Sequence, residues 1–339
     1  MTIITLDHFE PFDGMKKMFP NSNHPYINCT YNYLLSLARY FEKSEIPILS
    51  NNINLYKFDI SKIDTIGYFK IEVRNLRDKE AILNELGILS NKKSPTIHTF
   101  SKEILSSLSL GKPLTLDIDL YYQKGREFYY NKKHGLHPVI VCGFDSKKNE
   151  IHIIDDITEY KRYNILFSEF EKCCSDTLAN NGTNFLVEYS LSIQESTTLP
   201  TTEYVNQFVQ VMQWYRKDIF DSLSEILSFS NEFNNIIINS DLIETLSSTI
   251  YRKSSEKYRI NTLYNSNSKL DKINAKDSIN FVLDRIISDW TYLRNILLKA
   301  SYANERSDSK SYKTKTILRR IYDNEIVYNN LLFKMLDKY

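Results

Sequence analysis

The spacing of apolar residues divides the chain into a mixed first part and a helical second part. Up to about residue 195, stretches with helical spacing occur together with period-two or continuous apolar runs. Because most of the helical stretches come early and most of the strand-like runs come late, the pattern predicts an α+β domain with an antiparallel sheet. The expected helices cover 29–43, 77–89, 99–110 and 165–176, and the expected strands cover 66–73, 114–122, 138–144, 150–155 and 184–192.

The pattern changes at a Ser-, Thr- and Pro-containing linker near residues 196–202. Beyond the linker, apolar residues recur at three-, four- and seven-residue spacings almost to the end of the chain, and a last helix is expected over 316–336. We therefore expect two domains, 1–195 and 200–339, the second all-α. Long apolar stripes of this kind also allow a homodimer. The residues of the two clearest stripes are Val205, Phe208, Met212, Ile219, Leu223 and Ile226, and Ile279, Val282, Ile286, Trp290, Leu293 and Leu297.

Composition narrows the class of protein. Apolar residues make up 42% and charged residues 25% of the 339 residues, values that are ordinary for a globular chain, and the net charge of +1 gives no reason to expect a nucleic-acid partner. The chain has 8 glycines and no glycine-rich phosphate loop, which argues against a dinucleotide- or nucleotide-binding fold. No apolar run is long enough for a membrane span and the first residues do not resemble a signal peptide, so we expect a cytoplasmic protein with no membrane partner.

Four cysteines neither make a disulfide framework nor show a zinc-binding spacing, and no cofactor or metal is expected. Cys29 differs from the others in its position. Polar, turn-forming residues precede it and a strong helical pattern follows, so it lies near a helix start, where the backbone dipole favours a thiolate. A buried structural thiol is the alternative role for such a residue. Cys142 lies in an apolar strand and is expected to be a core residue, and Cys173 and Cys174 are adjacent in a helical stretch.

A histidine and a carboxylate on a hairpin complete a pattern typical of a cysteine nucleophile. His137 opens the apolar strand 138–144, and residues 145–149 have good turn chemistry before the next strand. In simple register Asp155 comes close to His137 and would hold the imidazole, although a slip of one residue would present Asp156 instead. His134 is a rival base in the preceding loop, and Asp145 is expected to cap the turn.

Three segments together resemble a known family. They are Tyr26-Ile27-Asn28-Cys29, Leu116-Asp117-Ile118-Asp119-Leu120-Tyr121-Tyr122 and His137-Pro138-Val139-Ile140-Val141-Cys142-Gly143-Phe144-Asp145. They are similar to the N-terminal domain of the butirosin biosynthesis protein H-like (BtrH-like) family, over about residues 10–190. The resemblance implies a papain-like cysteine-peptidase fold and transfer of an acyl group from an acyl carrier protein to an aminoglycoside amine in antibiotic biosynthesis.

By that resemblance Cys29 is the nucleophile, His137 the base and Asp155 the orienting residue. Asn23 lies six positions before Cys29, where papain-type enzymes usually carry a glutamine that donates to the oxyanion, and loop capping is its alternative role. In the strand that begins at Leu116, Asp119 and Tyr121 are the candidates for substrate binding, and a structural hydrogen bond is the alternative for Asp119.

Together with the cysteine-nucleophile pattern, the resemblance implies an acyltransferase that moves an acyl group from a carrier-protein thioester, or a similarly activated donor, through Cys29 to a small-molecule amine. Hydrolysis by the same triad, as a peptidase, amidase or thioesterase, is the first alternative. A non-catalytic scaffold on a cysteine-protease fold is the second. Two basic clusters are either docking surfaces for an acidic carrier protein or solvated helix faces: Arg252, Lys253, Lys257 and Arg259, and Lys310, Lys313, Lys315, Arg319 and Arg320.

Overall fold

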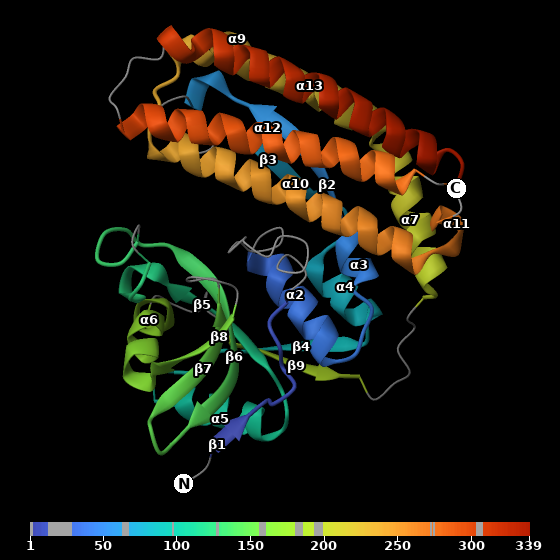
Figure 1. The fold of residues 1–339 in the computed structure, drawn as a ribbon. Coiled ribbons are helices and arrows are strands. Elements are labelled where there is room, and N and C mark those ends of the chain that lie inside the picture. Colours follow the sequence, from blue (N-terminus) through green and yellow to red (C-terminus); the bar gives the residue numbers. More distant parts are fainter. Residues whose placement is uncertain are drawn as a thin grey trace. The chain divides into compact units, whose positions relative to one another are not determined.

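The structure is a computed structural model in which two compact units alternate along the chain (Figure 1). Unit 1 spans residues 1–48 and 78–199, and unit 2 spans 49–77 and 200–339. The structure describes residues 3–12, 29–62, 68–96, 98–126, 129–155, 161–179, 186–192, 199–271, 273, 275–302 and 308–339, and of residues 29–30, 62, 176–179, 240, 271 and 308–311 it describes the backbone alone.

Unit 1 is built on an antiparallel sheet of seven strands. The order is β4-β9-β5-β6-β7-β8, and β1 pairs with the far end of β6. The middle of this sheet is apolar on both sides, as in Val139, Ile140 and Val141 of β6, which are all buried. The strands are β1 (Ile3–Thr5), β4 (Ile88–Lys93), β5 (Leu114–Asp119), β6 (Leu136–Asp145), β7 (Glu150–Asp155), β8 (Lys161–Leu166) and β9 (Leu186–Leu191).

Helices cover the sheet of unit 1. Helix α2 (Cys29–Tyr40) contacts β6, α5 (Phe100–Ser109) contacts β1, β5 and β6, and α6 (Phe167–Ala179) contacts β5, β7 and β8. Stacked rings join α5 to α6, with the centroids of Phe100 and Phe170 6.0 Å apart. The remaining helices are α3 (Ile46–Leu49), α4 (Lys79–Glu85) and the 3-10 turn η2 (Leu120–Tyr122), which ends the expected strand 114–122 three residues early.

The α+β prediction with an antiparallel sheet is confirmed, and the four expected helices of the first part are all present. Strands β4 and β8 were not predicted. They lie at the two edges of the sheet order and carry polar residues such as Lys92 and Lys161. Charged residues protect exposed sheet edges against pairing with other chains, and they also hide the apolar alternation that marks a strand.

Unit 2 consists of long helices and one β-hairpin. All twelve residues of the two predicted apolar stripes are buried, and the first stripe is divided over three helices that break at Tyr215 and Leu223. The helices are α7 (Thr201–Trp214), α8 (Arg216–Ser222), α9 (Ser224–Glu232), η3 (Phe233–Asn235), α10 (Ser240–Ser266), α11 (Ser268–Asp271), α12 (Lys276–Tyr302) and α13 (Asp308–Leu336).

The predicted domain division at 195–200 needs one correction, and the second domain is not all-α. Strands β2 (Asn52–Phe58) and β3 (Phe69–Asn75), with the turn η1 (Ile60–Lys62), belong to unit 2 although they lie within the first 195 residues. A two-stranded hairpin is unstable unless its apolar face is covered. Here Phe69 stacks on Phe229 of α9 with ring centroids 4.3 Å apart, and it lies 5.5 Å from the ring of Trp290 in α12.

A charged cluster is buried where this hairpin meets α10 and α13. Lys253 Nζ lies 2.8 Å from Glu256 and 3.0 Å from Glu325, and Tyr56 Oη donates to Glu325 at 2.7 Å. Arg259 donates to the carbonyl oxygen of Asn52 in β2 at 2.7 Å. Lys253 and Arg259 are thus core residues, so the prediction that they lie on a docking surface or a solvated helix face is wrong: their charges are balanced by carboxylates and carbonyls inside unit 2.

Candidate active site

His137 and Asp155 form a buried hydrogen-bonded pair. The distance between His137 Nε2 and Asp155 Oδ1 is 2.6 Å. Asp155 is fully buried and the His137 side chain is 10% exposed, so the pair is largely shielded from water. The contact joins β6 to the end of β7, which is the juxtaposition expected from the sequence.

A β-bulge decides that Asp155, rather than Asp156, faces His137. Near the turn β6 and β7 pair Asp145 with Glu150 and Gly143 with His152, but beyond Cys142 the register shifts and Val141 pairs with Ile153. Continued, this register brings Asp155 opposite Val139, diagonally next to His137 on the same face. Without the extra residue, Asp155 would lie opposite Ile140, on the other face, and Asp156 would take its place.

Gly143 makes room for this bulge. A Cβ atom added at residue 143 would lie 2.8 Å from Nδ1 of His152 and 3.1 Å from the carbonyl oxygen of Ile4 in β1. A side chain at residue 143 would therefore force the His152 ring to move and would crowd the backbone of β1. The glycine of the apolar run thus has a role in setting the register of the pair.

Three further side chains hold Asp155. Gln123 Nε2 donates to Oδ2 at 2.5 Å, Tyr163 Oη donates to Oδ2 at 3.0 Å, and Arg126 donates to Oδ1 at 2.7 Å. Burial alone would raise the pKa of Asp155. The hydrogen bond and charge of His137, the charge of Arg126 and the Gln123 hydrogen bond outweigh it and bring the pKa well below its usual range. Asp155 is therefore ionised.

An ionised Asp155 fixes the tautomer of His137. A carboxylate can only accept, so Nε2 of His137 carries the hydrogen of the 2.6 Å contact. In the neutral ring the lone pair is then on Nδ1, and Nδ1 is the atom that would exchange a proton with a nucleophile.

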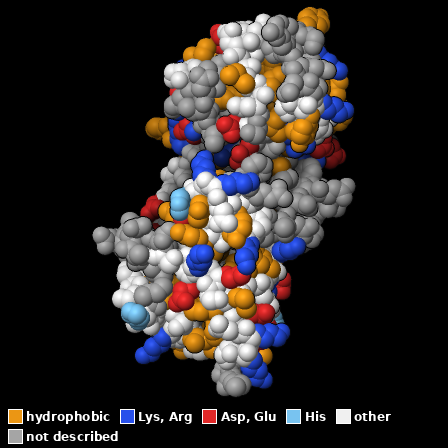
Figure 2. Space-filling view, turned by 90° about the vertical axis from the view of Figure 1, so that its left-hand side faces the viewer, with side chains coloured by type: hydrophobic (Ala, Val, Ile, Leu, Met, Phe, Trp, Pro, Cys, Tyr) orange, Lys and Arg blue, Asp and Glu red, His pale blue; other side chains and the backbone are white. Residues whose placement is uncertain are grey.

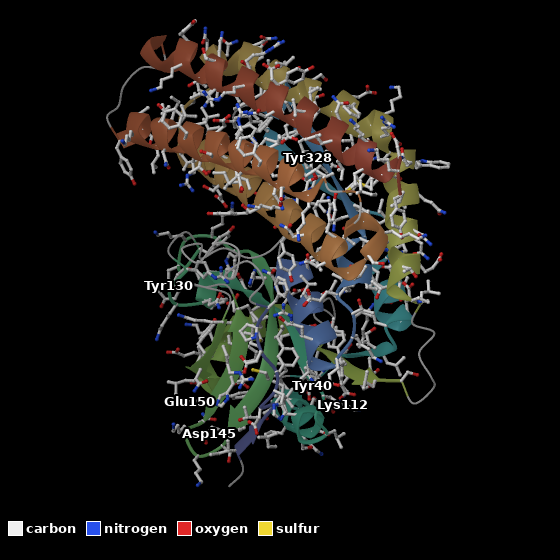
Figure 3. The ribbon with its side chains drawn as sticks, turned by 45° about the vertical axis from the view of Figure 1, so that its right-hand side comes forward. Tyr40, Lys112, Tyr130, Asp145, Glu150 and Tyr328 are labelled. Atoms are coloured by element: carbon white, nitrogen blue, oxygen red, sulfur yellow. The ribbon has the colours of Figure 1, made fainter. Side chains whose placement is uncertain are left out.

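Cys29 is the first residue of α2, as the sequence predicts, and only its backbone is described. At the other end of α2, Tyr40 Oη donates to the carbonyl oxygen of Gly111, just before β5 begins (Figure 3). Further up the helix, Tyr33 lies close to the buried Tyr189, whose hydroxyl is 2.9 Å from Thr115 Oγ1 of β5. Helix α2, which packs against β6, therefore has its last turn near the start of β5 and begins at the end of the sheet where β5 ends and β6 starts (Figure 1).

The same end of the sheet carries His137. In Figure 3, Tyr130 of the β5–β6 loop and the pair Asp145 and Glu150, which flank the β6–β7 turn, lie at opposite ends of the sheet. The start of α2 is at the Tyr130 end. A helix start with its cysteine and the histidine–carboxylate pair are thus brought to one end of unit 1. Asn23 and Asp156 lie outside the described residues.

Asp119 and Tyr121 form a second cluster around the rival base His134. Asp119 Oδ2 lies 2.6 Å from His134 Nδ1, and Oδ1 accepts from the backbone N–H groups of Tyr121 and Gly135. The Tyr121 ring stacks on the His134 ring. The Asp119 carboxylate is thus occupied by hydrogen bonds within the loop. These contacts favour the structural alternative for Asp119 over binding of a substrate amine.

Four residues near the pair were not assigned a role from the sequence. Gln123, Arg126 and Tyr163 contact Asp155 from a loop and from an edge strand. Asp117 is half-buried on β5; burial raises its pKa, and the charges of Lys79 and His137 partly oppose this rise. Gln123, Arg126 and Tyr163 follow no periodic pattern, and only the fold brings them near His137.

The other three cysteines are buried, which confirms the expectation for Cys142 and places Cys173 and Cys174 in the core as well. Burial raises the pKa of Cys142 to about 11 and that of Cys173 to about 11, and it raises the pKa of Cys174 well above its usual value.

Asp145 caps the β6–β7 turn by accepting from the N–H groups of Lys147 and Lys148. Within the described ranges, no group of three or more His, Cys, Asp or Glu side chains is placed to hold a metal ion, and no helix is long and apolar enough to span a membrane.

Acidic and basic side chains are interspersed with apolar ones on the face shown in Figure 2, in keeping with the net charge of +1.

Comparison with known proteins adds no assignment: no protein-family model matches the chain, and no curated protein is similar to it at a significant level.

Proposed function

We propose that unit 1 is a papain-like, BtrH-like acyltransferase that carries an acyl group on Cys29 from a carrier-protein thioester to a small-molecule amine. The observation that carries the proposal is the 2.6 Å contact between His137 and the ionised Asp155, at the end of the sheet where α2 begins with Cys29. A cysteine at a helix start, a histidine on a central strand and a carboxylate behind it are the parts of an activated thiol.

In this mechanism Nδ1 of His137 takes the proton of Cys29. The thiolate attacks the carbonyl carbon of the donor thioester, the carrier thiol leaves with that proton, and the acyl group remains on the cysteine. Asp155 keeps the imidazole in the required tautomer and stabilises its charged form. Asn23 is the proposed oxyanion donor, together with the backbone N–H of Cys29. The amine then resolves the acyl-enzyme and forms an amide.

Intact-protein mass spectrometry after incubation with an acylated carrier protein tests the proposal. We expect an adduct with the mass of one acyl group on the wild-type protein and on Cys173→Ala, but none on Cys29→Ala. Cys173 is the matched control because it is a buried thiol with a raised pKa. We expect His137→Ala to slow adduct formation about 10²- to 10⁴-fold, the usual contribution of a positioned base.

The products separate transfer from hydrolysis. With an amine present, an amide supports transfer, whereas free acid in place of the amide supports a peptidase, amidase or thioesterase that uses the same residues. Absence of any adduct, together with a Cys29 thiol that iodoacetamide does not alkylate at neutral pH, would overturn covalent catalysis and favour a non-catalytic scaffold.

A further inference from the structure

Arg126 and His137 share one carboxylate oxygen. Arg126 Nη2 lies 2.7 Å from Asp155 Oδ1, and His137 Nε2 lies 2.6 Å from the same atom, so the two nitrogens are at most about 5.3 Å apart. The Arg126 side chain is 14% exposed, and Asp155 is fully buried. A guanidinium, a carboxylate and an imidazole thus meet in a place that is largely closed to water.

The guanidinium is held in this position by a ring of hydrogen bonds. Arg126 Nε donates to Gln123 Oε1 at 2.9 Å, and Gln123 Nε2 donates to Asp155 Oδ2 at 2.5 Å. The contact between Arg126 and Asp155 closes the ring. The backbone of the loop supports it, since the N–H groups of Tyr129 and Tyr130 both donate to the carbonyl oxygen of Arg126. The positive charge of Arg126 is therefore fixed close to the imidazole.

The charge of Arg126 offsets that of Asp155. An ionised carboxylate beside an imidazole favours the imidazolium, whereas a nearby cation disfavours it. Asp155 is ionised and an arginine keeps its charge, so together they place no net charge beside His137. The His137 side chain is 10% exposed, and burial also disfavours the charged ring. Asp155 thus orients the imidazole without the strong bias toward imidazolium that a carboxylate alone would give.

Further titratable groups act on the pair from the neighbouring strands. Tyr163 of β8 donates to Asp155, and burial together with the Asp155 charge raises its pKa, so its hydroxyl is neutral. On β5, Asp117 interacts with the charges of His137 and of Lys79 at the start of α4. Cys29, at the start of α2, is the proposed reaction partner. Arg126 is the cation that shares an oxygen with the imidazole itself.

We propose that Arg126 is a positioning residue that keeps His137 a neutral base while the acyl group waits on Cys29. The inference rests on the proposed function, because it concerns the acyl-enzyme. There the carrier thiol has left with its proton, and a histidine beside Asp155 alone would take up another from water. A protonated His137 could not serve the amine. With a neutral ring, the amine nitrogen forms the C–N bond, the C–S bond breaks, the sulfur keeps the electron pair, and the nitrogen proton goes to Nδ1.

The first test reads the protonation of His137 directly. The full-length Cys29→Ala protein is the parent, because its imidazole titrates without coupling to the thiol. Ring NMR signals of His137, identified by their loss in His137→Gln, are followed against pH in the parent, Arg126→Gln, Arg126→Lys and Lys124→Gln. Lys124 is the matched control: it is a cation of the same loop, but it is 65% exposed and pairs with Glu169 of α6.

We expect the His137 midpoint to rise by about one to two pH units in Arg126→Gln, the usual effect of one charge at this distance. It should stay within about half a unit of the parent in Arg126→Lys, which keeps the charge, and in Lys124→Gln. An unmoved midpoint in Arg126→Gln, or an equal rise in Arg126→Lys, would overturn the role of the charge. If Arg126→Gln does not fold, the comparison is made on Asp155→Asn, where removing Arg126 removes an unpaired charge; there too the midpoint should rise by about one unit.

The second test uses the acyl-enzyme. Proteins that retain Cys29, with and without Arg126→Gln, are loaded from an acylated carrier protein and mixed with an alkoxyamine, which stays uncharged over the pH range used. The acid side of the pH profile for amide formation should move up by as much as the His137 midpoint. A moved midpoint with an unmoved profile would overturn the role of Arg126 in the acyl-enzyme. The titration needs no acyl donor, so a protein that never forms an adduct would refute the proposed function, while the titration still decides whether Arg126 keeps His137 neutral.

Discussion

Replacement of Asp155 by asparagine tests whether the buried pair is as strongly held as its contacts imply. The carboxylate accepts from His137 and Arg126 at Oδ1 and from Gln123 and Tyr163 at Oδ2. An asparagine has one acceptor and one N–H donor group. If the donor is on the Oδ1 side it meets the N–H groups of His137 and Arg126, and on the Oδ2 side it meets the Gln123 amide.

The expected cost follows from these contacts. Removing one member of a buried ion pair costs about 3–5 kcal/mol. The Arg126 side chain remains 14% exposed and keeps some hydration, so we expect the lower end, about 3 kcal/mol. With a dependence of about 3 kcal/mol per M of urea, the unfolding midpoint of unit 1 should fall by about 1 M.

The assay has to follow unit 1 on its own. Both tryptophans, Trp214 and Trp290, belong to unit 2, so fluorescence reports on unit 2. Hydrogen exchange of peptides that cover 136–155, measured against urea, follows β6 and β7. The matched control is Asp145→Asn. Asp145 is a buried aspartate like Asp155, but it lies at the end of β6, and among the contacts described it accepts only from the N–H groups of Lys147 and Lys148. Its loss should cost about 1 kcal/mol.

The pH dependence gives a second check. Because the folded state lowers the pKa of Asp155, its stabilisation is complete above its unfolded pKa of about 4 and is lost as the pH falls toward the folded value. The stability difference between wild type and Asp155→Asn should therefore be full at pH 7 and about 1 kcal/mol smaller at pH 3. An equal cost for the two asparagine variants, or a difference that does not change with pH, would refute the argument.

Two further substitutions test features of the fold. Gly143→Ala should destabilise unit 1 by about 1–3 kcal/mol in the same exchange assay. Adding His152→Ala should recover part of this loss, because it removes the side chain closest to the new Cβ atom. Full stability of Gly143→Ala would show that residue 143 is not crowded. Lys253→Met should lower the stability of unit 2 by about 3–5 kcal/mol, measured by tryptophan fluorescence. Adding Glu325→Gln should recover part of this loss. If the free-energy costs of the two substitutions simply add, the two buried charges do not interact.

The local periods of the sequence predict most elements of unit 1 but not how the elements meet. The apolar runs of β6 and β7 are clear, and a cysteine before a helical pattern is clear. The bulge at Cys142, which chooses between Asp155 and Asp156, lies next to Gly143, where a Cβ atom would meet His152 and Ile4, and no local pattern encodes this crowding. Gln123, Arg126 and Tyr163 were missed for the same reason, since each reaches Asp155 through tertiary structure alone.

The hairpin of unit 2 was missed for a different reason. The run 66–73 predicts a strand correctly, but an apolar strand face does not say which partner covers it. The rings that cover Phe69 belong to Phe229 and Trp290, which lie far along the chain. A division of the chain into two consecutive domains therefore assigns β2 and β3 to unit 1, although they belong to unit 2.

This interleaving of the two units has a consequence for how the protein is made. Residues 49–77 leave the ribosome well before the roughly 140 residues that complete unit 2. At a synthesis rate of about 5–20 residues per second, β2 and β3 wait on the order of ten seconds or longer with an apolar face uncovered. During that time the nascent chain is exposed to aggregation and to chaperones, and unit 2 cannot finish folding until α12 and α13 have been synthesised. A fragment ending at residue 199 would remain in that state permanently.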